Sequence, residues 1–362
     1  MLEIDYLPQP AGNFMVAVAM SGGVDSSVAA LQLLEAGYRV IGVTMQHFHN
    51  RDYGFAEGTG LEAAISDARK VCVALGITHH LIDLTSEFRA CVETDFIREY
   101  QAGRTPNPCV ICNHTIKWGK LMTAALQLGA DYFATGHYLQ KKVQAGLHRL
   151  FRSDDHGKDQ TYMLWRLTQQ QLAKTIFPLQ DLNKNQVREM AATRALPVHN
   201  REDSQEICFI KDHYQEYLRQ HISLTPGKII HKDGRIIGRH RGLPLYTIGQ
   251  RKGLNTPWSA PLFVLELDTD NNHLLVTDNP DDLFSREFLI KEINWISGKE
   301  PETAEKVTVQ IRYNSNPVPV SSWQKENDRI QVQTLMPVKS VTPGQSAVFY
   351  RDDELLGGGV IC

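Results

Sequence analysis

A glycine-rich turn joins the first strand and the first helix that the sequence predicts, and it restricts the fold more than any other feature. Phe14–Met20 has the apolar character of a buried strand, and Val28–Ala36 has a helical pattern that ends at Gly37. Between them stands the run Ser21-Gly-Gly-Val-Asp-Ser-Ser27. Two glycines let the backbone approach a phosphate, and the helix that follows offers unpaired N–H groups and the positive end of its dipole. The run has neither the Gly-Lys-Ser/Thr of a Walker loop nor Gly-x-Gly-x-x-Gly spacing, so we expect a phosphate loop of another type.

The first third of the chain alternates short apolar runs with helical patterns. This alternation, with a glycine after each helix, is typical of a parallel sheet with helices on both faces, so we expect an α/β fold. Ligands of such sheets bind at the carboxyl ends of the strands. The further strands are expected at Arg39–Met45, His79–Leu84 and Asp131–Thr135, and the further helices at Leu61–Leu75 and Thr115–Leu128.

Beyond about residue 210 the pattern changes to frequent turn signals and short strands, with one last helical pattern at Tyr214–His221. This composition predicts a β-rich half that ends in a barrel or sandwich. We therefore divide the chain into a catalytic domain at 1–210, a small linking domain at 211–280 and a C-terminal β-barrel domain at 281–362. The expected strands include Phe263–Leu267, Leu274–Thr277, Val307–Tyr313, Ile330–Leu335 and Ala347–Tyr350.

The net charge of −3 provides no overall attraction for a polyanion, so a nucleic-acid partner would need a local basic patch. The segment Lys228–Lys252 has seven basic residues and one acidic residue, Asp233. Such clustering is typical of nucleic-acid binders, although a solvated hairpin face would have the same composition. No run approaches the ~20 apolar residues of a membrane span, and Met1–Asn13 lacks the pattern of a signal peptide. We therefore expect a cytoplasmic protein with no membrane partner.

Three of the six cysteines differ from the others in their surroundings. Cys109, Cys112 and Cys208 lie beside Pro, Asn and Asp in loop-like sequence, whereas the others fit buried or terminal positions. In a reducing compartment such cysteines indicate catalysis or metal binding rather than a structural disulfide. A free thiol is only a few per cent thiolate at pH 7, and we expect a helix that starts near Asn113–Thr115 to favour ionisation.

The glycine-rich turn resembles the pyrophosphate loop of the ATP-pyrophosphatase superfamily, whose members transfer AMP from ATP to a substrate oxygen. Further segments, in the same order along nearly the whole chain, resemble one branch of it, the bacterial-type tRNA-specific 2-thiouridylases. These segments are Arg104–Asn113, Gly136–Tyr138, Lys158–Gln160, Asp203–Ile210, Gly249–Gly253 and Thr342–Gln345.

The resemblance implies ATP-dependent 2-thiolation of the wobble uridine, position 34, in the anticodon stem-loop of tRNA. The uridine C2 oxygen would be adenylylated, and Cys208 would accept a persulfide sulfur from a donor protein. Cys112 would be the partner of Cys208, so that turnover leaves a Cys112–Cys208 disulfide. Asp25 would help to place Mg²⁺ beside the phosphates of ATP.

Further site residues follow from the same resemblance, position by position. Asn107, Pro108 and Cys109 would approach the target base. ATP would be surrounded by Ala19, Met20, Ser21, Gly22, Gly23, Val24, Asp25, Ser26, Met45 and Gly136. Contacts with tRNA would come from His137, Lys158, Asp159, Gln160, Arg312, Tyr313 and Gln345.

One position departs from part of the family, because many members have an aspartate, thought to act as acid and base, where this chain has Cys109. Cys109 could be simple variation, or could complete a three-thiolate site with Cys112 and Cys208 for an iron–sulfur cluster or zinc. We favour the metal-free persulfide scheme.

Two other classes of protein are also considered. An amidotransferring ligase of the same superfamily would need an ammonia source and would leave Cys112 and Cys208 idle. A catalytically silent RNA-binding protein would need neither an intact phosphate loop nor the two cysteines.

Overall fold

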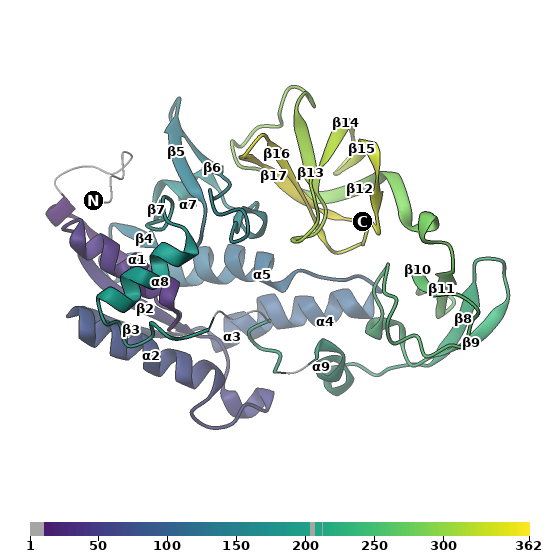
Figure 1. Cartoon of the computed structure of the whole chain (residues 1–362), viewed down its shortest axis with the longest axis horizontal. Coiled ribbons are helices and arrows are strands. Elements are labelled where there is room, and N and C mark those ends of the chain that lie inside the picture. Colours follow the sequence, from purple (N-terminus) through teal and green to yellow (C-terminus); the bar gives the residue numbers. More distant parts are fainter. Residues whose placement is uncertain (1–10, 203–206, 212) are drawn as a thin grey trace.

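The computed structural model of the chain describes residues 11–202, 207–211 and 213–362. The first four residues of the segment Asp203–Ile210, which contains Cys208, therefore lie outside the described residues. Figure 1 shows the α/β part of the chain, the small β8–β11 sheet and the C-terminal barrel as three regions joined around the helices α4 and α5. No helix in the described ranges is long and apolar enough to cross a membrane.

A five-stranded parallel sheet forms the N-terminal region, with the order β3-β2-β1-β4-β7. The central strand β1 is buried on both faces, since Val16, Ala17 and Val18 have no exposed surface. This arrangement confirms the α/β fold expected from the sequence. The strands are β1 (Met15–Ala19), β2 (Arg39–Gln46), β3 (Thr78–Asp83), β4 (Tyr132–Ala134) and β7 (Thr175–Ile176).

The helices of this region include two long runs that combine α-helical and π-helical turns. One run joins α3 (Thr85–Phe88), a π-helical segment (Arg89–Glu93) and α4 (Thr94–Gln101). The other joins α5 (Pro108–Ile111), a π-helical segment (Cys112–Leu121) and α6 (Met122–Gln127). The remaining helices are α1 (Val24–Glu35), α2 (Gly60–Leu75), α7 (Gln169–Ala173) and α8 (Lys184–Thr193), with 3-10 turns at Ala11–Asn13, Asn50–Tyr53 and Thr161–Met163.

The helix that contains the first two site cysteines begins earlier than the sequence predicted. It starts at Pro108, not near Asn113–Thr115, so Cys112 lies in its second turn. Asn107 caps this end, because its Oδ1 accepts a hydrogen bond from the Val110 N–H at 3.3 Å. Asn at the cap and Pro in the first turn are a usual start signal, which the cysteines and prolines of this segment obscured.

The central region pairs a helix with a four-stranded sheet of the order β10-β11-β8-β9. Only the β11–β8 pair is parallel. Its elements are α9 (Tyr214–His221), β8 (Gly227–His231), β9 (Ile236–His240), β10 (Phe263–Asp268) and β11 (His273–Thr277), with 3-10 turns at Leu243–Leu245 and Pro280–Leu283.

The C-terminal strands close into a six-stranded barrel, because β12 pairs with both β15 and β17. A hairpin from the N-terminal half, β5 (Gln140–Gln144) and β6 (Leu147–Phe151), extends the same sheet through pairing of β6 with β17. The predicted strand Val307–Tyr313 is too long, because β13 ends at Gln310. The barrel strands are β12 (Phe284–Trp295), β13 (Val307–Gln310), β14 (Val318–Glu326), β15 (Arg329–Lys339), β16 (Ser346–Arg351) and β17 (Glu354–Ile361).

Candidate active site

The turn between β1 and α1 has the local geometry of a phosphate cradle. Gly22 has a φ of +74°, and a Cβ at this position would lie 2.2 Å from the Ala64 carbonyl oxygen, so only glycine fits. Inside the turn, Ser26 Oγ accepts a hydrogen bond from the Ser21 N–H at 3.2 Å, and Ser27 Oγ donates to the Gly23 carbonyl at 2.8 Å. No side chain caps the N-terminus of α1. The first N–H groups of this helix can therefore bind a phosphate.

Asp25, in the first turn of α1, is held by two residues that are far away in the sequence. Lys184 Nζ donates to its two carboxylate oxygens at 2.7 and 2.9 Å, and the Tyr138 hydroxyl donates to Oδ1 at 2.7 Å. Lys184 is almost fully buried at the start of α8. On the other side of the loop, Arg201 Nη1 donates to the Gly22 carbonyl at 3.1 Å. Two basic side chains thus border the turn, an arrangement that suits the phosphates of ATP.

The segment Gly136–Tyr138 connects this loop with the cysteine region. A Cβ at Gly136 would lie 2.7 Å from the Ser26 nitrogen and 2.8 Å from the Asp25 carbonyl carbon, so the backbone of Gly136 packs directly on the loop. The next residue, His137, packs its ring at 5.3 Å from the indole of Trp118, on the cysteine helix. Its Nδ1 lies 2.9 Å from the Thr135 hydroxyl oxygen. One short segment therefore contacts both parts of the site.

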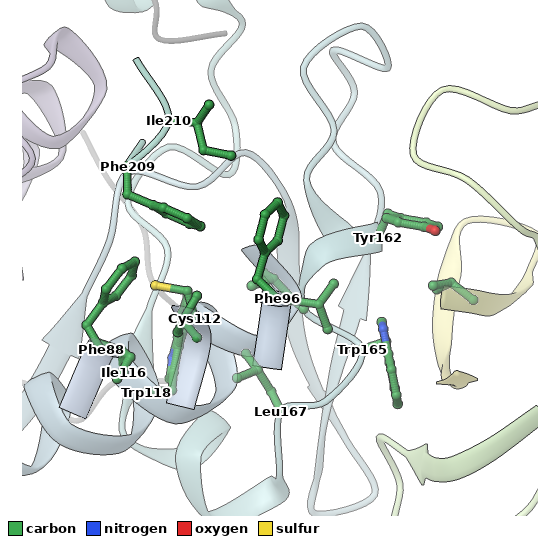
Figure 2. Packing of buried hydrophobic residues seen from close by; sticks show 14 of the residues in the cluster. Phe88, Phe96, Cys112, Ile116, Trp118, Tyr162, Trp165, Leu167, Phe209 and Ile210 are labelled. Atoms are coloured by element: carbon green, nitrogen blue, oxygen red, sulfur yellow. The ribbon is translucent and has the colours of Figure 1, made fainter. Parts of the chain in front are cut away.

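The three site cysteines come from two segments that the fold brings together. Cys112 is buried, and Figure 2 shows its sulfur among the rings of Phe88, Phe96 and Phe209. Phe209 packs at 5.4 Å from Phe88 and 5.5 Å from Phe96, which fixes the chain immediately after Cys208. All three cysteines are free thiols. Cys112 and Phe209, the residue after Cys208, thus belong to the same hydrophobic cluster, and the Cys112–Cys208 pair stays a prediction.

The pKa values of the three thiols show what opposes their ionisation. Burial raises the pKa of the Cys112 thiol to about 11, and the neighbouring Cys109 contributes in the same direction. Burial, followed by the Cys112 and Cys109 thiols, raises the pKa of Cys208 well above its usual range. Solvent reaches Cys109 and Cys208, but protein surrounds both sulfurs closely enough for burial to be the main cause of the raised pKa. The expected help from a helix N-terminus to Cys112 is therefore wrong, because burial dominates and the helix starts one turn earlier.

The residues that the resemblance assigned to tRNA contact gather where the barrel meets the N-terminal region. The Tyr313 hydroxyl donates to the Asp159 carbonyl at 3.0 Å, and Gln160 Oε1 accepts from the Tyr138 N–H at 3.0 Å. Gln345 Nε2 donates to the Thr105 carbonyl at 2.9 Å, beside the predicted base-contact segment. Lys158 is half-exposed next to the buried Asp159.

Arg312 is oriented by bonds within the barrel region. Its guanidinium donates to the carbonyls of Ile248 and Ser340 at 3.1 and 3.0 Å and to the Thr342 hydroxyl at 2.5 Å. Arg312 and Tyr313 follow β13 in a turn. Their contact with tRNA stays a prediction.

The basic segment Lys228–Lys252 is less uniformly charged in three dimensions than in sequence. Lys232 forms an ion pair with Asp282 at 2.6 Å, and Arg235 forms one with Asp233 at 2.6 Å. In contrast, Lys228 and Arg239 are exposed and lie opposite each other on β8 and β9. Neither has an ion-pair partner among the residues that the structure describes. Like charges in such positions repel, and an anion between them would relieve this repulsion.

The donor sets for metals differ between the two parts of the site. Within the described ranges, no group of three or more His, Cys, Asp or Glu side chains is arranged to hold a metal ion, and this includes the three cysteines. At the phosphate loop the Asp25 carboxylate is available beside the place of the phosphates, although Lys184 and Tyr138 already contact it.

Three residues near the site, Lys184, Lys117 and His47, have no signal in the sequence, and a fourth, Tyr138, belongs to the segment Gly136–Tyr138 without an expected role. Lys184 and Tyr138 contact Asp25 across 159 and 113 residues of chain. Lys117 lies on the cysteine helix close enough to lower the pKa of all three thiols. His47, just after β2 and two residues beyond Met45, is buried between the rings of Phe48 and Phe88.

Sequence families match three successive parts of the chain. Residues 14–212 match the family described as tRNA methyl transferase HUP domain. Residues 215–278 match the tRNA methyl transferase PRC-barrel domain, and residues 285–361 match the aminomethyltransferase beta-barrel domain. The fold and the loop therefore define a HUP-domain protein with two further β-rich domains.

Curated relatives align with almost the entire chain. The chain is 45% identical over 351 residues to the tRNA-specific 2-thiouridylase MnmA of Pelobacter propionicus, which covers 96% of this chain and 97% of the relative. It is 45% identical over 352 residues to the protein of the same name from Chloroflexus aggregans, with 96% and 98% covered. The Clostridioides difficile protein is 41% identical over 355 residues, with the same coverage. This chain belongs to the tRNA-specific 2-thiouridylase family.

Proposed function

We propose that this protein catalyses the ATP-dependent 2-thiolation of the wobble uridine, position 34, of tRNA. The observation that carries the proposal is the segment Gly136–His137, which packs on the phosphate loop with one residue and on the cysteine helix with the next. An adenylylated base held at this junction would be within reach of both chemistries. The family of the relatives supports the same reaction.

The first step activates the base. The C2 oxygen of uridine attacks the α-phosphorus of ATP, an O–P bond forms, and pyrophosphate leaves. The carbonyl carbon of a urea-like amide is a poor electrophile, and AMP is a much better leaving group than an oxide or hydroxide. The N–H groups at the start of α1, together with Lys184 and Arg201, would bind and neutralise the phosphates.

Asp25 has a different role in this proposal from the one that its position in the loop first indicated. Its carboxylate binds the Lys184 ammonium and the Tyr138 hydroxyl, so it orients Lys184 beside the loop. Mg²⁺ prefers phosphate oxygens and water and needs few protein ligands. We therefore propose that Mg²⁺ enters with ATP, neutralises phosphate charge and uses Asp25 at most as a secondary ligand.

The second step replaces the oxygen by sulfur. Cys208 receives a sulfur from a persulfide-carrying donor protein, and this terminal sulfur displaces AMP at C2. Cys112 supplies the electrons, because its bond to the Cys208 sulfur leaves the two cysteines as a disulfide and reduces the sulfur that is transferred. A dithiol reductant then resets the pair. A cytoplasmic location would keep these thiols reduced between turnovers.

Recognition of tRNA would use residues on both sides of this junction. Asn107, Pro108 and Cys109 form the first turn of the cysteine helix, and the target base would be turned out of its stack toward them. The predicted contacts at Lys158–Gln160, Arg312–Tyr313 and Gln345 would bind the surrounding stem-loop through shape and backbone.

The decisive experiment is nucleoside mass spectrometry of undermodified tRNA after incubation with the protein, ATP, Mg²⁺ and a persulfide source. We expect 2-thiouridine at position 34 and one AMP per thiolated base. Formation of ADP, or of an aminated base with an ammonia source, would contradict the proposal. Activity should persist in protein that contains no stoichiometric iron or zinc.

A further inference from the structure

A lysine on the cysteine helix occupies a position that only the unusual winding of this helix can give it. Lys117 follows Cys112 by five residues within the π-helical segment Cys112–Leu121. In a π-helix each N–H bonds to the carbonyl five residues earlier, so residues five apart lie on the same side of the helix. In an α-helix, with 3.6 residues per turn, the same two side chains would point in different directions. The π-helical winding therefore places Lys117 on the side of the helix that carries Cys112.

The Lys117 ammonium has no hydrogen bond or ion pair with any residue in the described part of the chain. Its charge nevertheless acts on the three site thiols. It lowers the pKa of Cys109, Cys112 and Cys208, in each case against the effect of burial. A half-buried cation that has no partner in the described residues and acts on three neutral thiols can stabilise an anion that forms on sulfur.

The charge of Lys117 also acts on two histidines, and the pKa of each is lowered. Burial and the charge of Lys117 hold the pKa of His137 well below its usual range. Burial lowers the pKa of His47 to about 4, against the effect of the nearby Met45 carbonyl. Both nitrogens of the His47 ring are buried without a hydrogen-bond partner. His47 and His137 thus add no second positive charge beside Lys117 at neutral pH.

We propose that Lys117 is the cation that stabilises anionic sulfur during sulfur transfer, with the unpartnered His47 as a neutral wall of the same subsite. This inference rests on the proposed function, and it adds a residue to the reaction of Cys112 and Cys208. The ligand of the subsite is a thiolate or hydrosulfide, not a phosphate, because Lys184 and Arg201 already border the phosphate loop.

The positive charge of Lys117 is needed when Cys112 attacks the persulfide on Cys208. Cys112 loses its proton to solvent, and the thiolate attacks the Cys208 sulfur that carries the persulfide. The Cys112–Cys208 bond forms, the bond to the terminal sulfur breaks, and this sulfur departs with the electron pair to C2 as AMP leaves. The two cysteine sulfurs are oxidised and the transferred sulfur is reduced. Negative charge is on sulfur, beside Lys117, until AMP leaves and carries it away.

The test compares Lys117→Met and Lys117→Arg with Lys120→Met, an exposed lysine on the same helix. Thiolation is measured in a single turnover with persulfide-loaded enzyme, and adenylylation by ATP–pyrophosphate exchange with tRNA. We expect Lys117→Met to slow thiolation by about 100-fold, as for loss of one charge-stabilising donor. Lys117→Arg should recover to within about tenfold of the wild type, and pyrophosphate exchange should be normal in all three variants.

A second measurement reports the thiols directly and needs no catalysis. The rate of iodoacetamide alkylation at Cys208 against pH, followed by peptide mass spectrometry, should shift to higher pH in Lys117→Met. A shift of one pH unit corresponds to a tenfold slower reaction at fixed pH. The exposed Cys362 of the same sample is the internal control, and its profile should not move.

The possible failures are separate. If wild-type enzyme shows neither exchange nor thiolation, the proposed function is wrong. If the wild type thiolates and Lys117→Met does so equally fast, or if the Cys208 alkylation profile is unchanged, only the role of Lys117 is overturned. Loss of pyrophosphate exchange in Lys117→Met would also overturn it, because the residue would then serve adenylylation or folding.

Discussion

The phosphate loop and the cysteine centre lie side by side in this protein but are built in different ways. The loop is seven consecutive residues that span the turn after β1 and the first turn of α1, and the hydrogen bonds of its serines are internal. The cysteine centre combines the helix that starts at Pro108 with the turn at Cys208, where Phe209 packs against Phe88 and Phe96 of the α3–α4 run. The geometry of a site made of consecutive residues depends on local sequence. The geometry of a site made of distant segments depends on how these segments pack together.

The two regions also handle charge in opposite ways. At the loop, each basic group has a partner, as in the Lys184–Asp25 ion pair and the bond from Arg201 to the Gly22 carbonyl. At the cysteine centre, Lys117 has no partner in the described residues, and the thiols are held neutral by burial. The loop is therefore prepared for an anion that arrives fully charged. The cysteine centre is prepared for an anion that has to be generated in place.

The largest expected effect separates the two regions by chemistry. Cys112→Ser and Cys208→Ser should each reduce thiolation by about 10³-fold or more, because residues that act as one unit lose nearly all activity at the first deletion. The double variant should be no worse than either single variant, and AMP formation should be largely retained. Nucleoside mass spectrometry and AMP release measure both steps, and Cys362→Ser is the matched control. Near-normal thiolation in either single variant would rule out this pair.

The next largest effect is expected for variants of the phosphate loop, which should lose adenylylation and keep an unchanged cysteine centre. Asp25→Ala and Lys184→Met each remove the ion pair that borders the phosphate loop, and we expect AMP formation to fall by about 100-fold. Alkylation of Cys208 should keep its wild-type pH profile. ATP–pyrophosphate exchange measures the loss, and a thermal melt shows whether the chain still folds. Normal turnover of Asp25→Ala would contradict the role of the phosphate loop.

A smaller effect is expected at the contact between the two regions. In Gly136→Ala the new Cβ would meet backbone atoms of Asp25 and Ser26 at 2.7 to 3.0 Å, and backbone cannot move aside as a flexible side chain can. We expect a rise in KM for ATP of about tenfold and a loss of stability of about 1–3 kcal/mol. Gly157→Ala is the control, because the nearest atom to its Cβ would be at 3.6 Å. Equal behaviour of the two variants would show that Gly136 does not position the loop.

Features that depend on local sequence could be predicted, whereas contacts between distant residues could not. The loop, the parallel sheet around it and the barrel were predicted because strand period, helix period and glycine positions are local signals. Lys184 was missed because its partner Asp25 lies 159 residues away. Lys117 was missed for a different reason. It lies on the same side of the helix as Cys112 only because the segment Cys112–Leu121 is π-helical, and the sequence pattern predicted an ordinary helix there. The helix start at Pro108 could have been found from Asn107 and Pro108 alone.

The smallest expected effect concerns the surface that would hold tRNA outside both regions. Lys228 and Arg239 face each other without ion-pair partners in the described residues, whereas Lys232 and Arg235 are neutralised by Asp282 and Asp233. Since each lost phosphate contact lowers the slope of log K against log salt by about one unit, Lys228→Gln with Arg239→Gln should lower it by about two. Lys232→Gln with Arg235→Gln removes the same formal charge but should leave the slope nearly unchanged. Filter binding of tRNA at several salt concentrations measures both. Equal slopes for the two double variants would mean that tRNA binding depends on the net charge of the protein and not on the pair Lys228 and Arg239. The segment Lys228–Lys252 would then be only a solvated face.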